Sequence, residues 1–233
     1  MAGGDGDDPV DHHRDTDRVR RVYDDIASHF SKTRAYAWPE VETFVESCES
    51  GARGLDVGCG NGRHMTVLDS KVEAVVGVDV SRNLLQEARK RRKQDGWHGE
   101  LLTGNAASLP LRADCVDVAV YVATIHHLPD QKRRRASLNE LARVLRDGGR
   151  ALVSAWSTAH DRFDVERDAR EGFDTTVDWT LPGGETVPRF YHIYAPAEFD
   201  ADLAASNLRV VESVISSGNC YATVTVDDEG KRP

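Results

Sequence analysis

The chain has 233 residues, 39% of them hydrophobic, and a formal net charge of −9 at pH 7. This length and apolar content suit one domain with a core of ordinary size, and no apolar run approaches the roughly 20 residues that a membrane-spanning helix needs. The four cysteines are widely spaced, with no Cys-x-x-Cys pair. This spacing argues against a disulfide framework and against a metal site of the chain's own, and it favours a reducing, cytoplasmic compartment.

The acidic surplus has a particular composition, because aspartate outnumbers glutamate and arginine outnumbers lysine. This bias is typical of a halophilic proteome, in which acidity keeps proteins soluble in salt that screens charge; an acidic protein from a GC-rich mesophile is the alternative. Residues 1–17 are rich in Gly and Asp and lack an apolar run. They are predicted to be a disordered acidic tail rather than a signal peptide. The domain is expected over 18–227, with 228–233 as a short tail.

Apolar periodicity predicts helices over 18–30 and from 38 to about 47. Strands then alternate with helices as far as residue 156. The predicted strands are 54–57, 74–79, 100–104, 116–123 and 150–156, and the predicted helices between them are 61–68, 81–93 and 136–145. This alternation is typical of a doubly wound parallel sheet.

The last third of the chain is predicted to differ from this alternation. Residues 157–188 are polar and have little periodicity, which predicts a long loop that carries function or forms a lid. A short helix is expected over 198–206. Residues 208–215 and 220–226 flank a Ser-Ser-Gly-Asn turn and are predicted to form an antiparallel hairpin.

Three alternate glycines, Gly58, Gly60 and Gly62, follow the strand that carries Asp56. Glycines permit positive φ and let the backbone approach a ligand, while the helix start that follows offers N–H groups to an anion. A dinucleotide fingerprint would place a further glycine at Arg63. The Asp-x-Gly-x-Gly-x-Gly spacing instead resembles motif I of the class I S-adenosylmethionine-dependent methyltransferases. A plain turn is the alternative.

That resemblance extends to the ends of the next strands. Asp79 ends the second strand, where an acid accepts hydrogen bonds from ribose hydroxyls; a helix-capping aspartate is the alternative. The resemblance implies that Asn105 meets the adenine amino group, and an ordinary Asx turn is the alternative there. It also implies that Asp56 orients the loop or the methionine amino group. The expected cofactor-binding residues are Asp56, Gly58, Gly60, Asp79, Asn105, Ala106 and Val122.

Four further segments make the family resemblance more specific. They are residues 22–30, 33–39, 122–128 and 188–194. All four resemble the tRNA wobble-uridine carboxymethyl methyltransferases, which esterify 5-carboxymethyluridine at the anticodon. The resemblance covers roughly 18–226. It implies a seven-stranded, mostly parallel Rossmann-like sheet in the order 3-2-1-4-5-7-6, ending in an antiparallel hairpin. S-adenosylmethionine is the cofactor that it implies.

This chemistry is compatible with the residues near the expected acceptor end. A carboxylate is already ionised near pH 7, so methyl transfer needs positioning and no strong base. Arg34 and Arg189 are candidates to clamp the carboxylate, because a guanidinium pairs with it bidentately; surface salt bridges are the alternative. His127 is the candidate to donate to the substrate or the uracil, unless His126 does so. A histidine buried against backbone is the alternative.

The roles of further residues near this end are left open. Tyr191 and His192 line the pocket or simply pack. Two basic runs, 89–93 and 132–135, are candidate RNA contacts, with solvated helix faces as the alternative.

The resemblance also implies a partner and leaves two other functions open. A small zinc-binding activator subunit would form a 1:1 heterodimer by pairing with the edge strand 100–104. Trp97 would anchor it, or pack on its own domain. A small-metabolite methyltransferase of the same fold and a non-catalytic cofactor-binding protein are the alternative functions.

Overall fold

The computed structural model describes residues 12–163 and 170–226. The predicted tails at 1–11 and 228–233 therefore lie outside the described residues. Helix α1 (His12–Thr33) already begins inside the region predicted to be a tail. Within this helix Arg20 pairs with Asp17 and Asp24, each at 3.3 Å and one turn away. Such i,i+3 and i,i+4 pairs favour the helical state, and the first of them joins Asp17, the last residue of the predicted tail, to the rest of α1.

The centre of the molecule is a seven-stranded sheet. Its strands are β1 (Gly51–Val57), β2 (Val72–Asp79), β3 (Gly99–Thr103), β4 (Val116–Val122), β5 (Leu145–Trp156), β8 (Arg209–Ser216) and β9 (Asn219–Thr225). The order is β3-β2-β1-β4-β5-β9-β8. The first five strands run parallel, and β9 is antiparallel to both β5 and β8. The predicted fold, its strand order and its antiparallel terminal hairpin are confirmed, with β3 and β8 at the edges.

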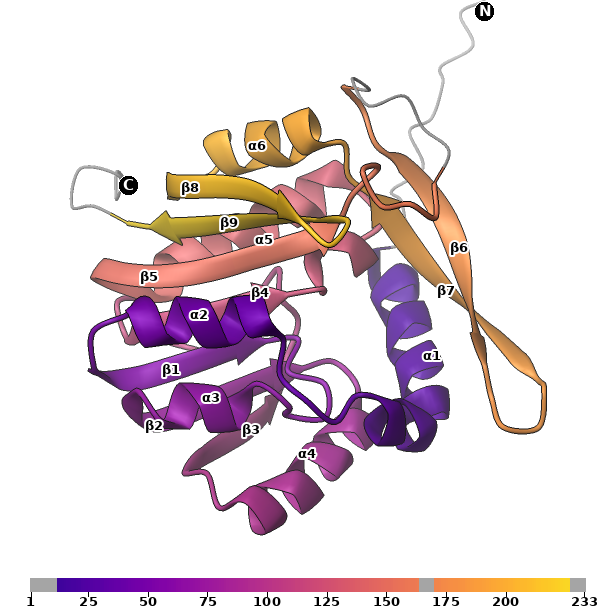
Figure 1. The fold of residues 1–233 in the computed structure, drawn as a ribbon, viewed down its shortest axis with the longest axis horizontal. Coiled ribbons are helices and arrows are strands. Elements are labelled where there is room, and N and C mark those ends of the chain that lie inside the picture. Colours follow the sequence, from indigo (N-terminus) through magenta and orange to yellow (C-terminus); the bar gives the residue numbers. More distant parts are fainter. Residues whose placement is uncertain (1–11, 164–169, 227–233) are drawn as a thin grey trace, which may run out of the picture.

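Helices cover both faces of this sheet (Figure 1). The helices α2 (Pro39–Ser47), α3 (Met65–Asp69) and α4 (Arg82–Asp95) pack on one face, and α5 (Gln131–Val144) and α6 (Pro196–Ala204) pack on the other. All seven residues of β4 are buried, as expected for a central parallel strand that is covered on both sides.

Helix α5 begins earlier than predicted, because Asp130 caps it by accepting from the Arg133 amide at 2.8 Å. Helix α3 begins later than predicted, at Met65, because residues 58–64 are taken up by the glycine loop. These shifts place the 132–135 run inside a helix rather than in front of one.

The prediction of a long loop over 157–188 is wrong from residue 173 onward. Strands β6 (Phe173–Thr180) and β7 (Thr186–Ile193) form a separate two-stranded antiparallel sheet. In β6, Val177 and Trp179 are buried while their neighbours Thr176 and Asp178 are exposed. This is the period-two pattern of a half-buried strand. The hairpin lies beside α1 (Figure 1).

Candidate active site

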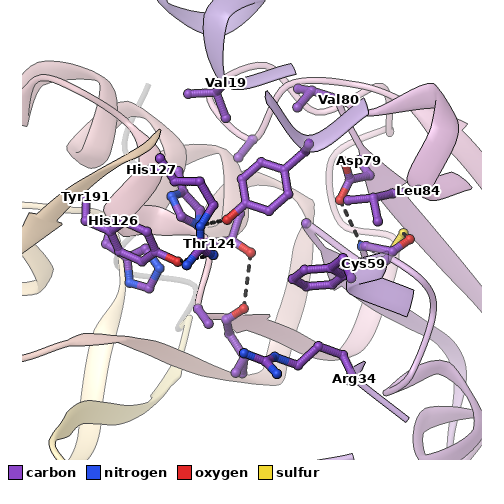
Figure 2. A pocket seen from close by; sticks show the side chains of 18 of the residues that line it. Val19, Arg34, Cys59, Asp79, Val80, Leu84, Thr124, His126, His127 and Tyr191 are labelled. Carbon is purple, nitrogen blue, oxygen red and sulfur yellow. Dashed lines mark hydrogen bonds between the residues drawn. The ribbon is translucent and has the colours of Figure 1, made fainter. Parts of the chain in front are cut away.

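A cavity of about 460 Å³ lies at the carboxyl ends of the parallel strands. Loops after β1, β2, β3 and β4 form one wall, and α1 with the β6–β7 hairpin forms the other. Figure 2 shows Asp79 and Leu84 on one side of it and His126, His127 and Tyr191 on the opposite side. Open α/β sheets bind ligands at this end, so the cavity is the candidate active site.

The glycine loop adopts the conformation that its sequence predicts. Gly58 and Gly60 have φ of 72° and 54°, which side chains rarely adopt. A Cβ atom at Gly58 would overlap the side chain of Thr124. The loop is held against β2, because the amides of Gly58 and Cys59 donate to the Val78 carbonyl at 2.7 and 3.1 Å. The backbone of the glycine loop therefore lines this wall of the cavity and leaves free the space that a side chain would occupy.

Two buried carboxylates lie next to this loop. Asp79 accepts from the amides of Gly60 and Ser81, each at 2.8 Å, and burial raises its pKa to about 6 although these hydrogen bonds oppose the shift. Its oxygens keep lone pairs that can accept hydroxyls from a ligand in the cavity, which Asp79 lines. Burial also raises the pKa of Asp56 to about 7, with Arg63 opposing, and its Oδ2 has no partner among the described residues. Asp56 lies behind the loop and does not line the cavity.

Asp79 does not cap α4, although a capping role was the predicted alternative for this residue. Ser81 is the cap of α4, and its hydroxyl accepts from the Leu84 amide at 3.1 Å. The predicted Asx turn at Asn105 is present, since its Oδ1 accepts from the Ala107 amide at 2.9 Å. Asn105 and Ala106 also line the cavity, so the turn and a ligand contact are compatible.

The exit of β4 has a strained backbone that sequence reasoning missed. Ala123 has φ of 52°, and its amide is held by the carbonyl and the hydroxyl of Ser154, both at 3.2 Å. The Val122 carbonyl accepts from the Thr124 hydroxyl at 3.1 Å. Non-glycine residues in the left-handed region cost about 1–3 kcal/mol and cluster at functional sites. No residue type marks this strain in the sequence.

Arg189 is a buried cation in the cavity wall. It is 7% exposed, its Nη1 donates to the Tyr191 hydroxyl at 2.7 Å, and its guanidinium carbon lies 4.9 Å from the Trp179 ring centre. Its Nε has no partner, and no carboxylate pairs with it within residues 12–163 and 170–226. A buried charge without a counter-charge is unfavourable, so this wall is preset to receive an anion.

Arg34 reaches the same aromatic ring from α1. Its guanidinium carbon lies 5.3 Å from the Trp179 ring centre and 5.9 Å from that of Phe30. The Arg34 carbonyl accepts from the Asn61 amide side chain at 2.9 Å, which ties the end of α1 to the glycine loop. The structure thus brings Arg34 and Arg189 together, and in the described ranges neither forms the surface salt bridge of the alternative reading.

His127 is oriented by its neighbours. Its Nδ1 must carry the proton, because it donates to the Phe190 carbonyl at 3.0 Å, so its Nε2 accepts from the Tyr23 hydroxyl at 2.7 Å. Burial lowers the pKa of His127 to about 4, so the ring is neutral. Both ring nitrogens are therefore bonded within the protein, which matches the alternative of a buried histidine. Tyr23 was missed because its helical spacing indicates only a core position.

His126 and His192 also have protein partners. His126 accepts from the Trp156 amide through Nδ1 at 3.1 Å, and burial holds its pKa well below the usual range. His192 lies between two carboxylates, Asp174 at 2.7 Å and Glu198 at 2.9 Å. It links the β6–β7 hairpin to α6 and does not line the cavity.

Two sequence-based expectations about surface contacts are limited by packing. In the 132–135 run, Arg134 is 4% exposed and pairs with Glu198, while Arg135 pairs with Asp202 at 2.8 Å. These two arginines therefore take part in an ion network between α5 and α6, while Lys132 stays exposed. Trp97 is 3% exposed and packs in the core beneath α2–α4, with Arg92 over its ring. It cannot anchor a partner from there.

Within the described ranges, no group of three or more side chains is arranged to hold a metal ion. None of the helices described is both long and apolar enough to span a membrane.

Comparisons with known proteins place this geometry in context. A family model described as "Methyltransferase domain" matches residues 55–153. The chain is 42% identical over 139 residues to the tRNA (carboxymethyluridine(34)-5-O)-methyltransferase of Xenopus tropicalis, a match that covers 60% of this chain and 21% of that protein. It is 32% identical over 207 residues to the Schizosaccharomyces pombe protein of the same name, covering 78% of this chain and 84% of that protein. The chain thus matches only about a fifth of the Xenopus relative's length.

Solved structures share the fold at low sequence identity. An S-adenosylmethionine-dependent methyltransferase from Clostridium acetobutylicum superposes with a TM-score of 0.67 at 16% identity, over 88% of this chain and 99% of that one. A putative methyltransferase solved in complex with the Haloferax volcanii Trm112 methyltransferase activator superposes with a TM-score of 0.63, also at 16% identity, over 90% of this chain and 97% of that one.

Proposed function

The chain belongs to the tRNA (carboxymethyluridine(34)-5-O)-methyltransferase family, and we propose that it transfers a methyl group from S-adenosylmethionine to the carboxylate of a carboxymethylated wobble uridine in tRNA. The observation that carries the proposal is the buried Arg189, which faces the cavity without a counter-charge. A carboxylate is the acceptor chemistry that such a guanidinium fits best, because the pair is bidentate and both charges are satisfied.

The cofactor half of the cavity fits the proposed cofactor. Asp79 would accept its ribose hydroxyls, and Asn105 would face the adenine beside the apolar Ala106 and Leu84. The positive-φ glycines Gly58 and Gly60 leave room for its methionine part, and Asp56, which lies behind the loop, would orient that loop. The Val122 carbonyl would border this part. When bound, the cofactor supplies an electrophilic methyl group on a positively charged sulfur.

The acceptor half would work by positioning. Arg189, with Arg34 across the Trp179 ring, would orient one carboxylate oxygen toward the methyl carbon. The carboxylate is already ionised near pH 7, so this chain would not need a base to remove a proton from the acceptor. The neutral state of the neighbouring groups agrees with this scheme, because burial raises the pKa of Tyr23 and lowers that of His127. Neither group is then a strong base at pH 7, because Tyr23 stays protonated and a histidine with a pKa of about 4 binds a proton only weakly.

The Tyr23–His127 pair would have a positioning role. The 2.7 Å hydrogen bond joins α1 to the exit of β4, and the His127 bond to Phe190 continues it to β7. These three elements form the acceptor wall. We therefore assign His127 to holding the wall together rather than to direct proton transfer.

The proposal is tested with tRNA whose wobble uridine carries a free carboxymethyl group and with tritiated cofactor. Label should enter the tRNA and be released by mild base, as expected for a methyl ester, while tRNA with an unmodified wobble uridine stays unlabelled. Cofactor binding measured by calorimetry without any base-labile label would contradict the substrate. Label confined to the small-molecule fraction of a cell extract would favour the metabolite alternative, and binding without turnover would favour the non-catalytic one.

We also propose that a small zinc-binding activator subunit pairs with β3. The support is the exposed edge position of this five-residue strand and the likeness to a methyltransferase solved with an activator. Edge strands offer unpaired N–H and C=O groups to such a partner. Co-expression with a candidate activator should give a 1:1 complex in gel filtration, with slowed hydrogen exchange at Gly99–Thr103. Slowed exchange at β8 instead, where Val211 and Ile215 are exposed, would move the partner to the opposite edge.

A further inference from the structure

The cavity is lined by more arginines than are needed to bind one carboxylate group. Four arginines line it, and they are Arg34, Arg63, Arg162 and Arg189. Arg63 belongs to the cofactor side, where it stands over the Trp38 ring and lowers the pKa of Asp56. Arg34 and Arg189 meet over Trp179. The proposed reaction leaves Arg162 without a role.

Arg162 is exposed at the wall of the cavity. Its guanidinium forms no ion pair and no hydrogen bond with residues 12–163 or 170–226, although Asp178 lines the same cavity. It still lies close enough to the Tyr191 hydroxyl to lower that group's pKa, as Arg189 and Arg34 also do, against the larger upward shift from burial. Three guanidiniums therefore converge on the acceptor side, one buried and two exposed.

The backbone that carries Arg162 is firmly held. The Arg162 amide donates to the His160 ring at 3.0 Å, and the Phe163 amide donates to the His160 carbonyl at 2.9 Å. The rings of His160 and Phe163 pack on Trp156, with centroids 5.4 and 6.0 Å away. The backbone of this turn is held in one conformation. This reduces the conformational entropy that the Arg162 side chain loses when a ligand binds.

Position and exposure together separate the tasks of the arginines: Arg34 is exposed but shares the Trp179 ring with the buried Arg189, whereas Arg162 is exposed and, among the described residues, makes no contact with that ring. A base and its carboxymethyl group fit inside the cavity, whereas the ribose–phosphate chain of an RNA must continue outside and stays at the mouth. The buried Arg189 therefore faces the carboxylate, and an exposed guanidinium at the mouth faces the phosphates. Guanidinium groups bind phosphate through paired hydrogen bonds.

We infer that Arg162 forms a second anion subsite, which binds a backbone phosphate of the acceptor RNA beside the nucleotide that is methylated. This inference rests on the proposed function. It also gives a chain of negative net charge a basic contact for RNA that lies next to the chemistry.

The experiment compares an RNA with a nucleoside that lacks phosphate. Binding of an anticodon stem-loop carrying 5-carboxymethyluridine is measured by fluorescence anisotropy across a salt series, and the free nucleoside is measured as a competitive inhibitor of stem-loop methylation. The variants are Arg162→Ala and Arg162→Lys. The matched control is Arg53→Ala, which removes an equal charge from the exposed start of β1, at the opposite end of the sheet.

Arg162→Ala should weaken stem-loop binding by about 5- to 30-fold, the factor for one exposed charge-assisted contact. The slope of log Kd against log salt should fall by about 0.7, the value for one phosphate contact on a single strand. The inhibition constant of the nucleoside should stay within about twofold. Arg162→Lys should keep the salt slope and lose part of the affinity, because it keeps the charge without the paired geometry.

Two results would overturn the inference. One is an Arg162→Ala effect on stem-loop binding no larger than that of Arg53→Ala. The other is a loss of nucleoside affinity equal to the loss of stem-loop affinity, which would place Arg162 on the carboxylate or the base. Wild-type protein that binds the stem-loop but transfers no methyl group would refute the proposed function instead, and the anisotropy comparison would still decide the role of Arg162.

Discussion

Replacement of Arg189 by methionine should separate function from stability. Methionine keeps an unbranched apolar stem between Trp179 and Tyr191 and removes the charge. Losing the buried cation relieves a desolvation cost of several kcal/mol. Against this stand two cation–π contacts of about 0.5–2 kcal/mol each and one charge-assisted hydrogen bond of about 1.5–3 kcal/mol. These contributions nearly cancel, so we expect the free energy of unfolding in urea to change by no more than about 1–2 kcal/mol.

Methyl transfer should respond very differently. Removing one partner of a buried charge pair costs about 2–5 kcal/mol, so kcat/KM should fall by at least about 30-fold. Cofactor affinity measured by calorimetry should stay within about twofold, because Arg189 lies on the acceptor wall. Arg189→Lys is the control and should give an intermediate rate, because lysine keeps the positive charge but lacks the planar guanidinium that can form two parallel hydrogen bonds with a carboxylate. Parallel losses of cofactor binding and transfer in Arg189→Met would mean that the residue supports the fold, and full activity would refute the carboxylate clamp.

Variants at Asp79, Gly58 and Glu198, with Gly148 as a control position, test the cavity wall and the α5–α6 ion network. Burial puts the pKa of Asp79 at about 6, above its unfolded value of about 3.9, so at this group the apo protein loses stability as pH rises from about 4 to 6. Cofactor affinity should rise about tenfold from pH 5 to 7 as the carboxylate ionises; a flat calorimetric profile in the wild type, or an unchanged one in Asp79→Asn, would contradict its role. Gly58→Ala should abolish measurable cofactor binding because its Cβ meets Thr124, whereas Gly148→Ala, with φ of 71° and open space around its Cβ, should cost only about 1–2 kcal/mol of stability. If both glycine variants behave alike, the steric argument fails. Glu198→Gln should lower the free energy of unfolding by about 1–3 kcal/mol, because the carboxylate accepts from Arg134, His192 and the Gly172 amide; an unchanged urea midpoint would show that the α5–α6 network is not stabilising.

The sequence by itself determined the fold and brought the residues that we propose for cofactor binding to one edge of the sheet. Asp79 ends β2, Asn105 lies two residues beyond the end of β3, and the glycine loop follows β1. Parallel strands bring their carboxyl ends to one edge, so local patterns in chain order suffice to bring these residues together. The requirement for positive φ at Gly58 and Gly60 is likewise local, because it follows from the sharp turn between strand and helix.

Local patterns failed where a residue's partner lies far away in the chain. Arg134 and Arg135 look like part of a free basic patch, but their acids lie more than 60 residues later on α6. Trp97 looks available beside an edge strand, and only packing beneath α2–α4 buries it. The β6–β7 hairpin was hidden because one face of each strand is polar, which leaves few apolar residues to show its period.

The acceptor half was decided by tertiary structure alone. Arg34, His127 and Arg189 could be named as candidates from their residue types, but they come from α1, the β4 exit and β7. Whether a guanidinium is a solvated surface charge or a buried, unpaired anion receptor depends on burial and on missing counter-charges, and neither is a local property of the chain. The same holds for His127, whose tautomer follows from its partners Phe190 and Tyr23 and whose neutrality follows from burial, because a protonation state is set by what surrounds the ring once the chain has folded.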